Sequence, residues 1–339
     1  MTEARPSPLF SVIVATRNRA ALFAIALRSV LDQSFQDLEI VVVNDGSSEE
    51  EMAGYRDVLA PVADKVRLLT LVRAERGHGQ SYALNFGAAH ANGAYLCFLD
   101  DDDQWTDPGH LRRAAGAIAA KGNATPGEAT PGEATNDGQP DLVLSNQKAF
   151  LNGTPVDRVV WIEDLTDRLT GTPGAAGAYT VTAADLLACQ AHCHLNTMIV
   201  SRAFWQAIGG MDEGLRYECD RDVYLRAIDQ ARSIEYLPNV VSRHNIPDPA
   251  AGTSMSTAES DLSKRLYQLR VMDKAVLFST RPEMRRYAMR QRLYALDHLA
   301  AAAARANRPE AAAYYRREAL LAKLAQAWSK TAGRLTGRS

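Results

Sequence analysis

Residues 94–103 read AYLCFLDDDD in one-letter code: six apolar residues followed by Asp100, Asp101, Asp102 and Asp103. The apolar part lacks polar alternation, so it predicts a strand buried on both faces of a parallel sheet. Four adjacent carboxylates repel one another, and a solvated acidic loop is the ordinary explanation of such a run. At the end of a strand, a hard divalent cation such as Mg²⁺ or Mn²⁺ would offset the repulsion, because these ions prefer carboxylate and phosphate oxygens.

The residues before this run alternate between short apolar segments and helical segments. This alternation predicts an α/β fold with a mostly parallel sheet that carries helices on both faces. Asp107 and Pro108 then supply an N-cap and a first helical position for a further helix. The predicted strands are 9–15, 38–43, 66–72 and 94–99, and the predicted helices are 20–32, one opened at Ser48, and 80–91.

Two of these helices carry more detailed expectations. In the helix at 20–32, helical spacing places Leu22, Ile25, Ala26, Ser29 and Val30 on one face. Ser48 is followed three residues later by Glu51, which is the pattern of a capping box. We therefore expect Ser48 to cap the second helix.

The chain after residue 120 departs from this alternation. Residues 120–140 contain Ala-Thr-Pro-Gly-Glu twice in succession without apolar anchors, which indicates a low-complexity, flexible surface insertion. After residue 258 the chain is rich in Ala, Leu and Arg at helical spacing, and 284–326 is typical of a helical hairpin. We therefore predict an α/β domain at 1–250 and a C-terminal helical extension at 258–335.

Composition narrows the class of protein. The chain has 339 residues and a formal net charge of −2, which gives no argument for nucleic-acid binding. The charge is uneven, because the segment from Arg281 to the end contains 13 Lys/Arg against 4 Asp/Glu. Four cysteines fit a reducing compartment better than a disulfide framework. Neither a signal-peptide pattern nor an apolar run of roughly 20 residues is evident, so we expect a soluble, cytoplasmic protein.

Polar residues follow the predicted strands at their carboxyl ends, where open α/β sheets bind ligands. Thr16, Arg17 and Asn18 follow the first strand, and Asp45 follows the second. A carboxylate at position 45 can accept a hydrogen bond from a base N–H such as that of uracil, although Asn-Asp-Gly-Ser is also ordinary turn chemistry. Together with the aspartate run, these residues predict a binding cleft at one edge of the sheet.

The order of the motifs resembles that of family 2 glycosyltransferases with the GT-A fold. The resemblance covers residues 9–245 and implies a Rossmann-like sheet, a nucleoside-diphosphate-sugar donor such as a UDP-sugar, Mn²⁺ or Mg²⁺, and inversion at the anomeric carbon. The acceptor would be a saccharide, a lipid-linked sugar or a protein in bacterial polysaccharide or glycoconjugate synthesis. The matching segments are 11–19, 29–34, 39–47, 79–85, the Leu-Asp-x-Asp-Asp metal motif at 99–103, 209–213 and 220–226.

The resemblance also implies roles for single residues. Asp100 would contact the ribose or a metal-bound water, and Asp102 would bind the metal directly. Asp220 matches the family's usual catalytic base, with Glu218 as the alternative because Cys219 replaces the family's glutamate. The implied donor-binding residues are Thr16, Arg17, Asn18, Asp45, Arg73, His78, Asn85, Asp100 and Asp101.

The sequence departs from the family's pattern at several donor-side positions. Ala15 and Arg17 stand where proline and tyrosine are frequent, which puts the base-stacking contact in doubt. Leu84 stands where many members have arginine. The phosphate contact would then come from the basic loop that contains Arg73, Arg76 and His78.

Two histidine sites lie near the matching segments. In the family, the stretch that contains His194 and Asn196 lies near the acceptor, so both could contact acceptor hydroxyls, and a structural histidine is the equal alternative. Zinc binding at 189–194 would need a second ligand pair, which the sequence lacks. His244 is the implied remaining metal ligand, with a simple surface turn as the alternative, and 247–257 is expected to form an active-site lid.

Other functions remain open. A sugar nucleotidyltransferase usually carries a glycine-rich loop after the first strand, and residues 15–19 contain no glycine. Dinucleotide binding would need Gly-x-Gly-x-x-Gly there. Leu84 and Cys219 motivate a third alternative, a glycosyltransferase-like binding or scaffold protein without turnover.

The basic C-terminal helices indicate a partner of their own. Arg285, Arg286, Arg290 and Arg292 lie close together in the sequence. They could form a homodimerisation arm or a peripheral contact with the anionic inner face of a membrane, and a solvated helix face is the alternative.

Overall fold

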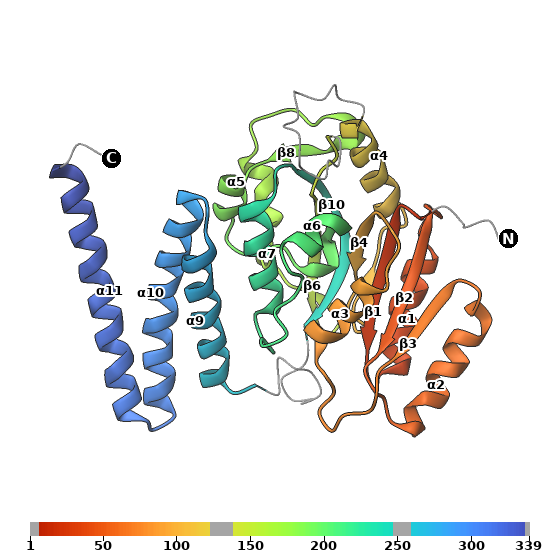
Figure 1. Cartoon of the computed structure of the whole chain (residues 1–339), viewed down its shortest axis with the longest axis horizontal. Coiled ribbons are helices and arrows are strands. Elements are labelled where there is room, and N and C mark those ends of the chain that lie inside the picture. The colour runs from red at the N-terminus through yellow and green to blue at the C-terminus, as the bar shows by residue number, and fades with distance from the viewer. Residues whose placement is uncertain (1–6, 123–137, 247–258, 336–339) are drawn as a thin grey trace. The chain divides into compact units, whose positions relative to one another are not determined.

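The computed structural model describes residues 7–122, 138–246 and 259–335 (Figure 1). Most of the predicted insertion at 120–140, and all of the predicted lid at 247–257, lie outside these residues. The chain divides into two compact units, Met1–Asp248 and Pro249–Ser339. The sheet belongs to the first unit, the second contains long helices, and each unit is described by itself.

The first unit is built on a sheet with a parallel half and a mixed half. Its strands are β1 (Phe10–Thr16), β2 (Leu38–Asn44), β3 (Val66–Thr70), β4 (Tyr95–Phe98), β5 (Gln104–Trp105), β6 (Leu142–Leu151), β7 (Thr154–Pro155), β8 (Tyr179–Val181), β9 (Met198–Ser201) and β10 (Ile234–Ile246). The main strand order is β3-β2-β1-β4-β9-β6-β10-β5. The neighbours from β3 to β4 are parallel, whereas β9 is antiparallel to both β4 and β6.

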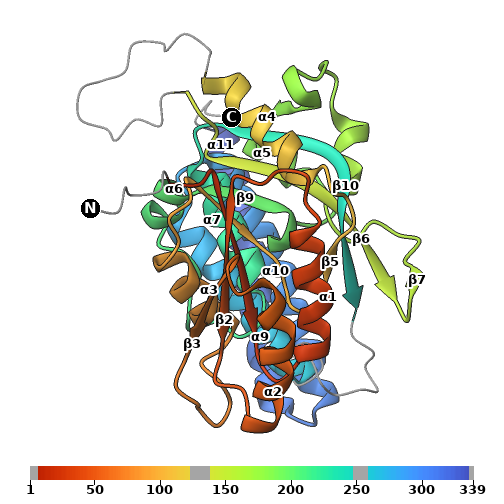
Figure 2. The same ribbon diagram turned by 90° about the vertical axis from the view of Figure 1, so that its right-hand side faces the viewer.

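Helices cover both faces of the parallel half, as Figure 2 shows for α1 (Ala20–Leu31) and α3 (Gln80–Ala89). Val12 and Val14 of β1 belong to a buried cluster with residues of α1, α2 (Glu49–Leu59) and α4 (His110–Gly122). On the other face, a Cβ at Gly87 of α3 would lie 2.6 Å from Ile13 Cγ2, so this glycine lets α3 approach the sheet closely. The predicted α/β fold with helices on both faces is therefore confirmed.

Helix α1 buries only part of the predicted face. Leu22 is 43% exposed and Ile25 is 52% exposed, whereas Ala26 and Val30 are buried. The buried face includes Phe23 and Leu27 together with Val30. Phe23 and Leu27 fill the space above the sheet, and their positions on the helix turn Leu22 and Ile25 outward.

The helix ends differ in detail from the expectations. Ser48 is the N-cap of α2, and its hydroxyl accepts from the Glu51 N–H at 3.4 Å. The Glu51 carboxylate accepts from the Ala20 N–H at 3.5 Å, so it links α2 to α1. Helix α4 begins at His110 rather than at Pro108, and the Asp107 carboxylate accepts from the Gly109 N–H at 2.8 Å. The remaining helices of this unit are α5 (Ala183–Leu187), α6 (Arg202–Ala207) and α7 (Cys219–Gln230).

The second unit contains three long helices: α9 (Asp261–Phe278), α10 (Pro282–Arg305) and α11 (Pro309–Leu335). Helix α10 packs against both of the others. The predicted C-terminal helical extension is therefore confirmed. Among the described residues, no helix is both long enough and apolar enough to cross a membrane.

Candidate active site

The aspartate run lies in the turn between β4 and β5. Thr16 at the end of β1 and Arg19 just after it donate hydrogen bonds to two of its carboxylates. Asp101 points into the protein, where its Oδ2 accepts from Thr16 Oγ1 at 2.7 Å and its Oδ1 accepts from Arg19 Nη1 at 3.1 Å. Asp102 Oδ2 accepts from the same guanidinium at 2.9 Å. Arg19 therefore neutralises part of the charge of the run, and both Thr16 and Asp101 are used inside the protein.

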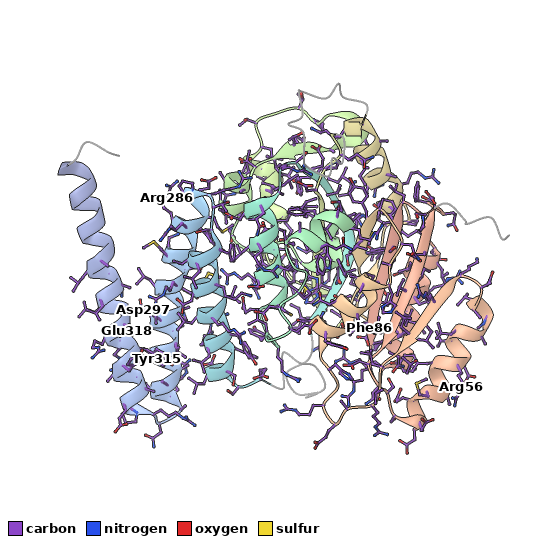
Figure 3. The ribbon with its side chains drawn as sticks, viewed as in Figure 1. Arg56, Phe86, Arg286, Asp297, Tyr315 and Glu318 are labelled. Carbon is purple, nitrogen blue, oxygen red and sulfur yellow. The ribbon has the colours of Figure 1, made fainter. Side chains whose placement is uncertain are left out.

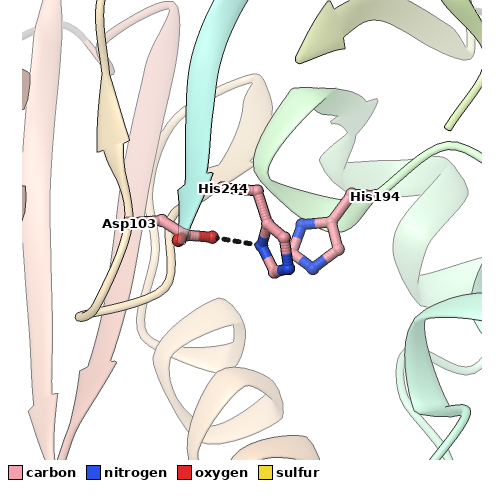
Figure 4. Close-up of side chains that lie close together, drawn as sticks. All are labelled: Asp103, His194 and His244. Carbon is pink, nitrogen blue, oxygen red and sulfur yellow. Dashed lines mark hydrogen bonds and ion pairs between the residues drawn. The ribbon is translucent and has the colours of Figure 1, made fainter. Parts of the chain in front are cut away.

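Asp103 is buried and holds the end of β10. Its Oδ2 lies 2.8 Å from His244 Nδ1, and its Oδ1 accepts from the Asn245 N–H at 2.7 Å. Figure 4 shows this contact, with the His194 ring beside the His244 ring. Because Nδ1 of His244 faces the carboxylate, Nε2 is the ring nitrogen left for another ligand.

Asn196 connects the aspartate run to the middle of the sheet. It lies in a short 3₁₀ turn, Leu195–Thr197, directly before β9, and is 1% exposed. Its side chain accepts from the Asp100 N–H at 2.9 Å and donates to Asp103 Oδ2 at 2.6 Å. The amide of Asn196 is thus a buried bridge between Asp100 and Asp103, and its predicted contact with acceptor hydroxyls stays a prediction.

His194 joins the aspartate run to Asp220. Its Nδ1 accepts from the Asn196 N–H at 3.2 Å, so the proton of the neutral ring is on Nε2. This Nε2 lies 3.1 Å from Asp220 Oδ2 and 3.7 Å from Asp100 Oδ2. Asp220 is in the first turn of α7. The N–H of His194 is thus placed to orient the Asp220 carboxylate.

Trp161 forms an aromatic wall beside the two histidines. Its ring centroid lies 4.7 Å from that of His194 and 5.1 Å from that of His244, with interplanar angles of 65° and 88°. The side chain is half-buried. Its indole N–H is buried and has no hydrogen-bond partner among the residues that the structure describes.

Burial and mutual repulsion shift the pKa values of this cluster. Burial, followed by the charge of Asp220, raises the pKa of Asp100 well above its usual range. Burial and the charges of Asp103 and Asp101 raise the pKa of Asp102 to about 6, although Arg19 opposes the shift. Carboxylates that are costly to ionise together are those that a nearby cation would stabilise.

The two histidines shift in opposite directions. Burial lowers the pKa of His194, which keeps this ring neutral. Burial also acts against the charged form of His244, but the hydrogen bond and the charge of Asp103 outweigh it and raise the pKa of His244. The net pKa shift therefore favours the protonated form of His244, whereas for His194 burial outweighs the raising effect of Asp220 and favours the neutral form.

The residues present fit a divalent cation. Asp100, Asp102 and Asp103 form one group, and Asp103, His194 and His244 form another, with the ligand atoms of each group within 4.8 Å of one another. The first group offers only carboxylate oxygens, which suit Mn²⁺ or Mg²⁺, and the second adds two imidazole nitrogens to the shared Asp103. Neither group contains a cysteine. Cys193, which precedes His194 in the stretch 189–194, lies with its Sγ 3.2 Å from Thr197 Oγ1.

Asp45 holds the loop before α3 at the same edge of the sheet. Its carboxylate accepts from the His78 N–H at 2.9 Å and from the Gly79 N–H at 3.1 Å, and lies 2.7 Å from His78 Nδ1. A Cβ at Gly77 would lie 2.6 Å from Asp45 Oδ2, and the φ of this glycine is +66°. Asp45 and His78 are thus brought together, and a carboxylate with about four acceptor positions retains one for a ligand.

The other predicted donor-side residues around this loop are partly engaged. Arg17 Nη2 donates to the carbonyls of Ala74 and Glu75 at 3.1 and 3.0 Å. Asn18 has a φ of 54°, and its Oδ1 accepts from the Ser48 N–H at 2.8 Å. Arg73 is exposed. It lies in the loop after β3, and the backbone of this loop packs against Gly46. Of these residues, Arg73 has the side chain most open to a ligand.

Asn85 is engaged with the segment before α7. Its Oδ1 accepts from the Met211 N–H at 2.8 Å, and its Nδ2 donates to the Met211 carbonyl at 3.0 Å and to Glu213 Oε1 at 2.9 Å. Its amide ties α3 to the turn that contains Met211. Binding of the donor by Asn85 stays a prediction.

The two candidate bases have different surroundings. Glu218 is the N-cap of α7 with a φ of 62°, and its carboxylate lies 3.5 Å from Arg221 Nη1. Asp220, in contrast, is paired with His194. Asp222, two residues after Asp220, pairs with Arg226 four residues later on the same helix, at an Nη2–Oδ2 distance of 2.9 Å.

Sequence reasoning missed three side chains of the cluster. Arg19 ends the matching segment 11–19, and its place between the first strand and the first helix, at the ligand-binding edge of the sheet, is the signal that could have found it. Gln80 donates to Asp100 Oδ1 at 2.7 Å and stands in a matching segment. Trp161 lies in a region without clear periodicity, so no local signal placed it in the site.

Solved structures share this architecture. The chain resembles Staphylococcus aureus TarS in complex with UDP-GlcNAc, with a TM-score of 0.59 and 19% identity over 85% of this chain and 72% of that one. It also resembles the mannosyltransferase PcManGT of Pyrobaculum calidifontis in complex with GDP-Man and Mn²⁺, with a TM-score of 0.56 and 19% identity over 96% of this chain and 84% of that one. The fold and the cluster at its strand ends define a protein of the GT-A class.

Sequence comparison gives a partial match. Residues 11–144, less than half of the chain, match the model of Glycosyl transferase family 2. The chain is 35% identical over 97 residues to the Campylobacter jejuni GalNAc(5)-diNAcBac-PP-undecaprenol beta-1,3-glucosyltransferase, and 35% identical over 98 residues to the Bacillus subtilis putative teichuronic acid biosynthesis glycosyltransferase TuaG. These matches span 29% of this chain and 30% and 37% of the two relatives.

Proposed function

We propose that the protein transfers a sugar from a nucleoside diphosphate to an acceptor hydroxyl, with inversion at the anomeric carbon. The proposal rests mainly on the position of His194 between the aspartate run and Asp220. Its Nε2 lies 3.1 Å from Asp220 and 3.7 Å from Asp100. A metal-binding carboxylate group and a separately held carboxylate are the two parts that such a transfer requires.

The relatives support the choice of substrates. Two structural neighbours were solved with UDP-GlcNAc and with GDP-Man, which supports a nucleoside-diphosphate sugar as the donor. Two sequence relatives are named for an undecaprenol-linked acceptor and for teichuronic acid synthesis. We infer an acceptor in bacterial polysaccharide or glycoconjugate synthesis, and a UDP-sugar as the first donor to test.

Asp220 is the proposed base. An acceptor hydroxyl is a weak nucleophile, so its proton must leave as the glycosidic bond forms. The Nε2–H of His194 fixes one Asp220 oxygen at 3.1 Å and leaves the other for the acceptor. The loss of the acceptor proton to Asp220 is then coupled to departure of the nucleoside diphosphate, on the opposite side of the anomeric carbon.

Asp102 and His244 are the proposed metal ligands, and Asp103 positions His244 through Nδ1. A bound Mn²⁺ or Mg²⁺ would act as a Lewis acid toward the diphosphate leaving group. Among the donor-side residues, we propose that Asp45 contacts the base through its remaining acceptor position, that Asp100 contacts the ribose, and that Arg73 approaches the phosphates.

Paired variants test the base. Asp220→Asn should lower kcat by about 10²–10⁴-fold, the usual contribution of a positioned base, while the affinity for the donor is retained. Glu218→Gln should keep kcat within about ten-fold, because Glu218 pairs with Arg221 instead of His194. Transfer would be measured with a panel of nucleotide sugars and Mn²⁺, and donor affinity by calorimetry. A dead Glu218→Gln variant beside an active Asp220→Asn variant would reverse the assignment.

A thermal-shift screen tests the donor and the metal separately from turnover. A nucleotide sugar that binds should raise the unfolding midpoint in Mn²⁺ and lose most of this effect in EDTA, because ligands of the folded state stabilise it by mass action. If the midpoint rises equally with and without the metal, the proposed role of Asp102 and His244 is wrong.

A further inference from the structure

The second unit leaves one side of its last helix uncovered. Helix α10 packs against α9 and against α11, and α11 buries the small residues Ala312 and Ala319. These two residues are seven positions apart and lie on one face of α11. Figure 3 labels Tyr315 and Glu318, which are half-buried on the same helix.

Large apolar side chains are exposed on the rest of α11. Tyr314 is 52% exposed, Leu320 57%, Leu321 50% and Leu324 58%. At 100° per residue, these four positions lie within one sector of the helix surface, away from Ala312 and Ala319. We name these four residues the outer stripe of α11. Solvation of four such side chains is costly, so the stripe indicates a partner.

The charge around the outer stripe is positive. The segment from Arg281 to the end contains 13 Lys/Arg against 4 Asp/Glu. Arg316 and Arg317 are exposed on α11 itself, and Arg286 is exposed on α10. In the described part of this segment, four basic side chains lie within 3.5 Å of a carboxylate: Arg292 of Asp273, Arg305 of Asp261, Arg317 of Glu318 and Lys323 of Asp297. The net charge of the segment is nevertheless positive, because its basic residues outnumber its acidic ones.

We propose that the outer stripe of α11 docks on an anionic lipid bilayer. The stripe would enter the boundary between headgroups and acyl chains, and the arginines would contact lipid phosphates, with their aliphatic stems along the apolar surface. A second copy of the chain fits less well, because a dimer through α11 would bring two strongly basic segments together. This proposal is independent of the proposed transfer reaction.

Vesicle co-sedimentation of the full chain tests the proposal. The probes are phosphatidylcholine vesicles and vesicles in which about a third of the lipid is phosphatidylglycerol. The protein should bind the anionic vesicles, bind the neutral ones at least about ten-fold more weakly, and be released by high salt, because the attraction between exposed charges is screened.

Two matched variants locate the contact. Leu320→Glu with Leu324→Glu should reduce binding to anionic vesicles by about ten-fold or more, because two charges would enter the apolar boundary. Leu277→Glu is the control, since Leu277 is 85% exposed on α9, outside the stripe. Circular dichroism would confirm that both variants keep their helices.

Three outcomes would overturn the proposal. The first is failure of the unmodified chain to bind anionic vesicles, and the second is equal loss of binding in the control variant. The third is a dimer in light scattering that the double variant dissociates, which would make a second copy the partner of the stripe.

Discussion

Replacement of Asp102 by asparagine should stabilise the metal-free protein and abolish its response to metal. In the folded protein the pKa of Asp102 is raised from 3.8 to about 6, mainly by burial and by the charges of Asp103 and Asp101. The carboxylate therefore costs stability when it is ionised. The difference corresponds to about 3 kcal/mol at most, from about 1.4 kcal/mol per pKa unit.

Solvent reduces this cost, since the Asp102 side chain is 29% exposed. We expect a net gain of about 1–2 kcal/mol for Asp102→Asn in EDTA at pH 8, or roughly 2–8 °C in the unfolding midpoint for a unit of this size. The sign depends on pH. Because the folded-state pKa is the higher one, the cost is complete above about pH 6 and decreases as the pH falls toward the unfolded value of 3.8. At pH 5 the gain should be about half of that at pH 8.

Thermal unfolding followed by calorimetry measures both effects. In EDTA the variant should unfold at the higher temperature, whereas in Mn²⁺ the midpoint of the unmodified protein should rise and that of the variant should not. Asp57→Asn is the control, because Asp57 is exposed on α2. If Asp102→Asn unfolds at a lower temperature in EDTA at pH 8, or if Mn²⁺ stabilises both proteins equally, the electrostatic reasoning is refuted.

Substitutions at three further positions separate positioning, structural and donor-side roles. His194→Ala should lower kcat by about ten-fold or more without raising the donor KM. His194→Gln should recover part of the lost kcat, because its amide can replace the Nε2–H that donates to Asp220. A selective loss of donor affinity in His194→Ala would contradict the positioning role. Asn85→Ala should lower the free energy of unfolding by about 2–3 kcal/mol in urea titrations, because the Met211 turn loses its hydrogen bonds, and should leave the donor KM unchanged. Gly77→Ala should weaken donor binding by about ten-fold in calorimetry, since its Cβ would meet Asp45 Oδ2 at 2.6 Å; unchanged affinity would separate Asp45 from the donor site.

Local patterns were sufficient for much of the fold. The strands of the parallel half are short and continuously apolar, so each could be placed within a few residues of its observed ends. The Asp222–Arg226 pair follows from helical spacing alone. The face of α1 could not be predicted as safely, because Leu22 and Phe23 are adjacent and the sheet determines which of them is buried.

The site was predictable where its residues follow strands, and less so where the contacts join distant parts of the chain. Position at the carboxyl end of β1, β2 or β4 indicated Thr16, Asp45 and the aspartate run. The side-chain partners came from the three-dimensional arrangement: Asp103 meets His244 across 141 positions, and Asn85 meets Met211 across 126. Residue types alone do not distinguish an amide that binds a ligand from one that ties two segments together.

The two parts of the candidate site come from different halves of the sequence, and the antiparallel strand β9 lies between them in the sheet. The donor-side groups and the aspartate run come from residues before 104, within the stretch that matches the family model, whereas His194, Asp220 and His244 come from the later half. Asn196, one turn before β9, is the joint between them. Under the proposed mechanism, the base that meets the acceptor comes from the later half, so substitutions around Asp220 would change the handling of the acceptor while the earlier half stays unchanged. Such a division of the gene would let one donor chemistry serve many different glycans.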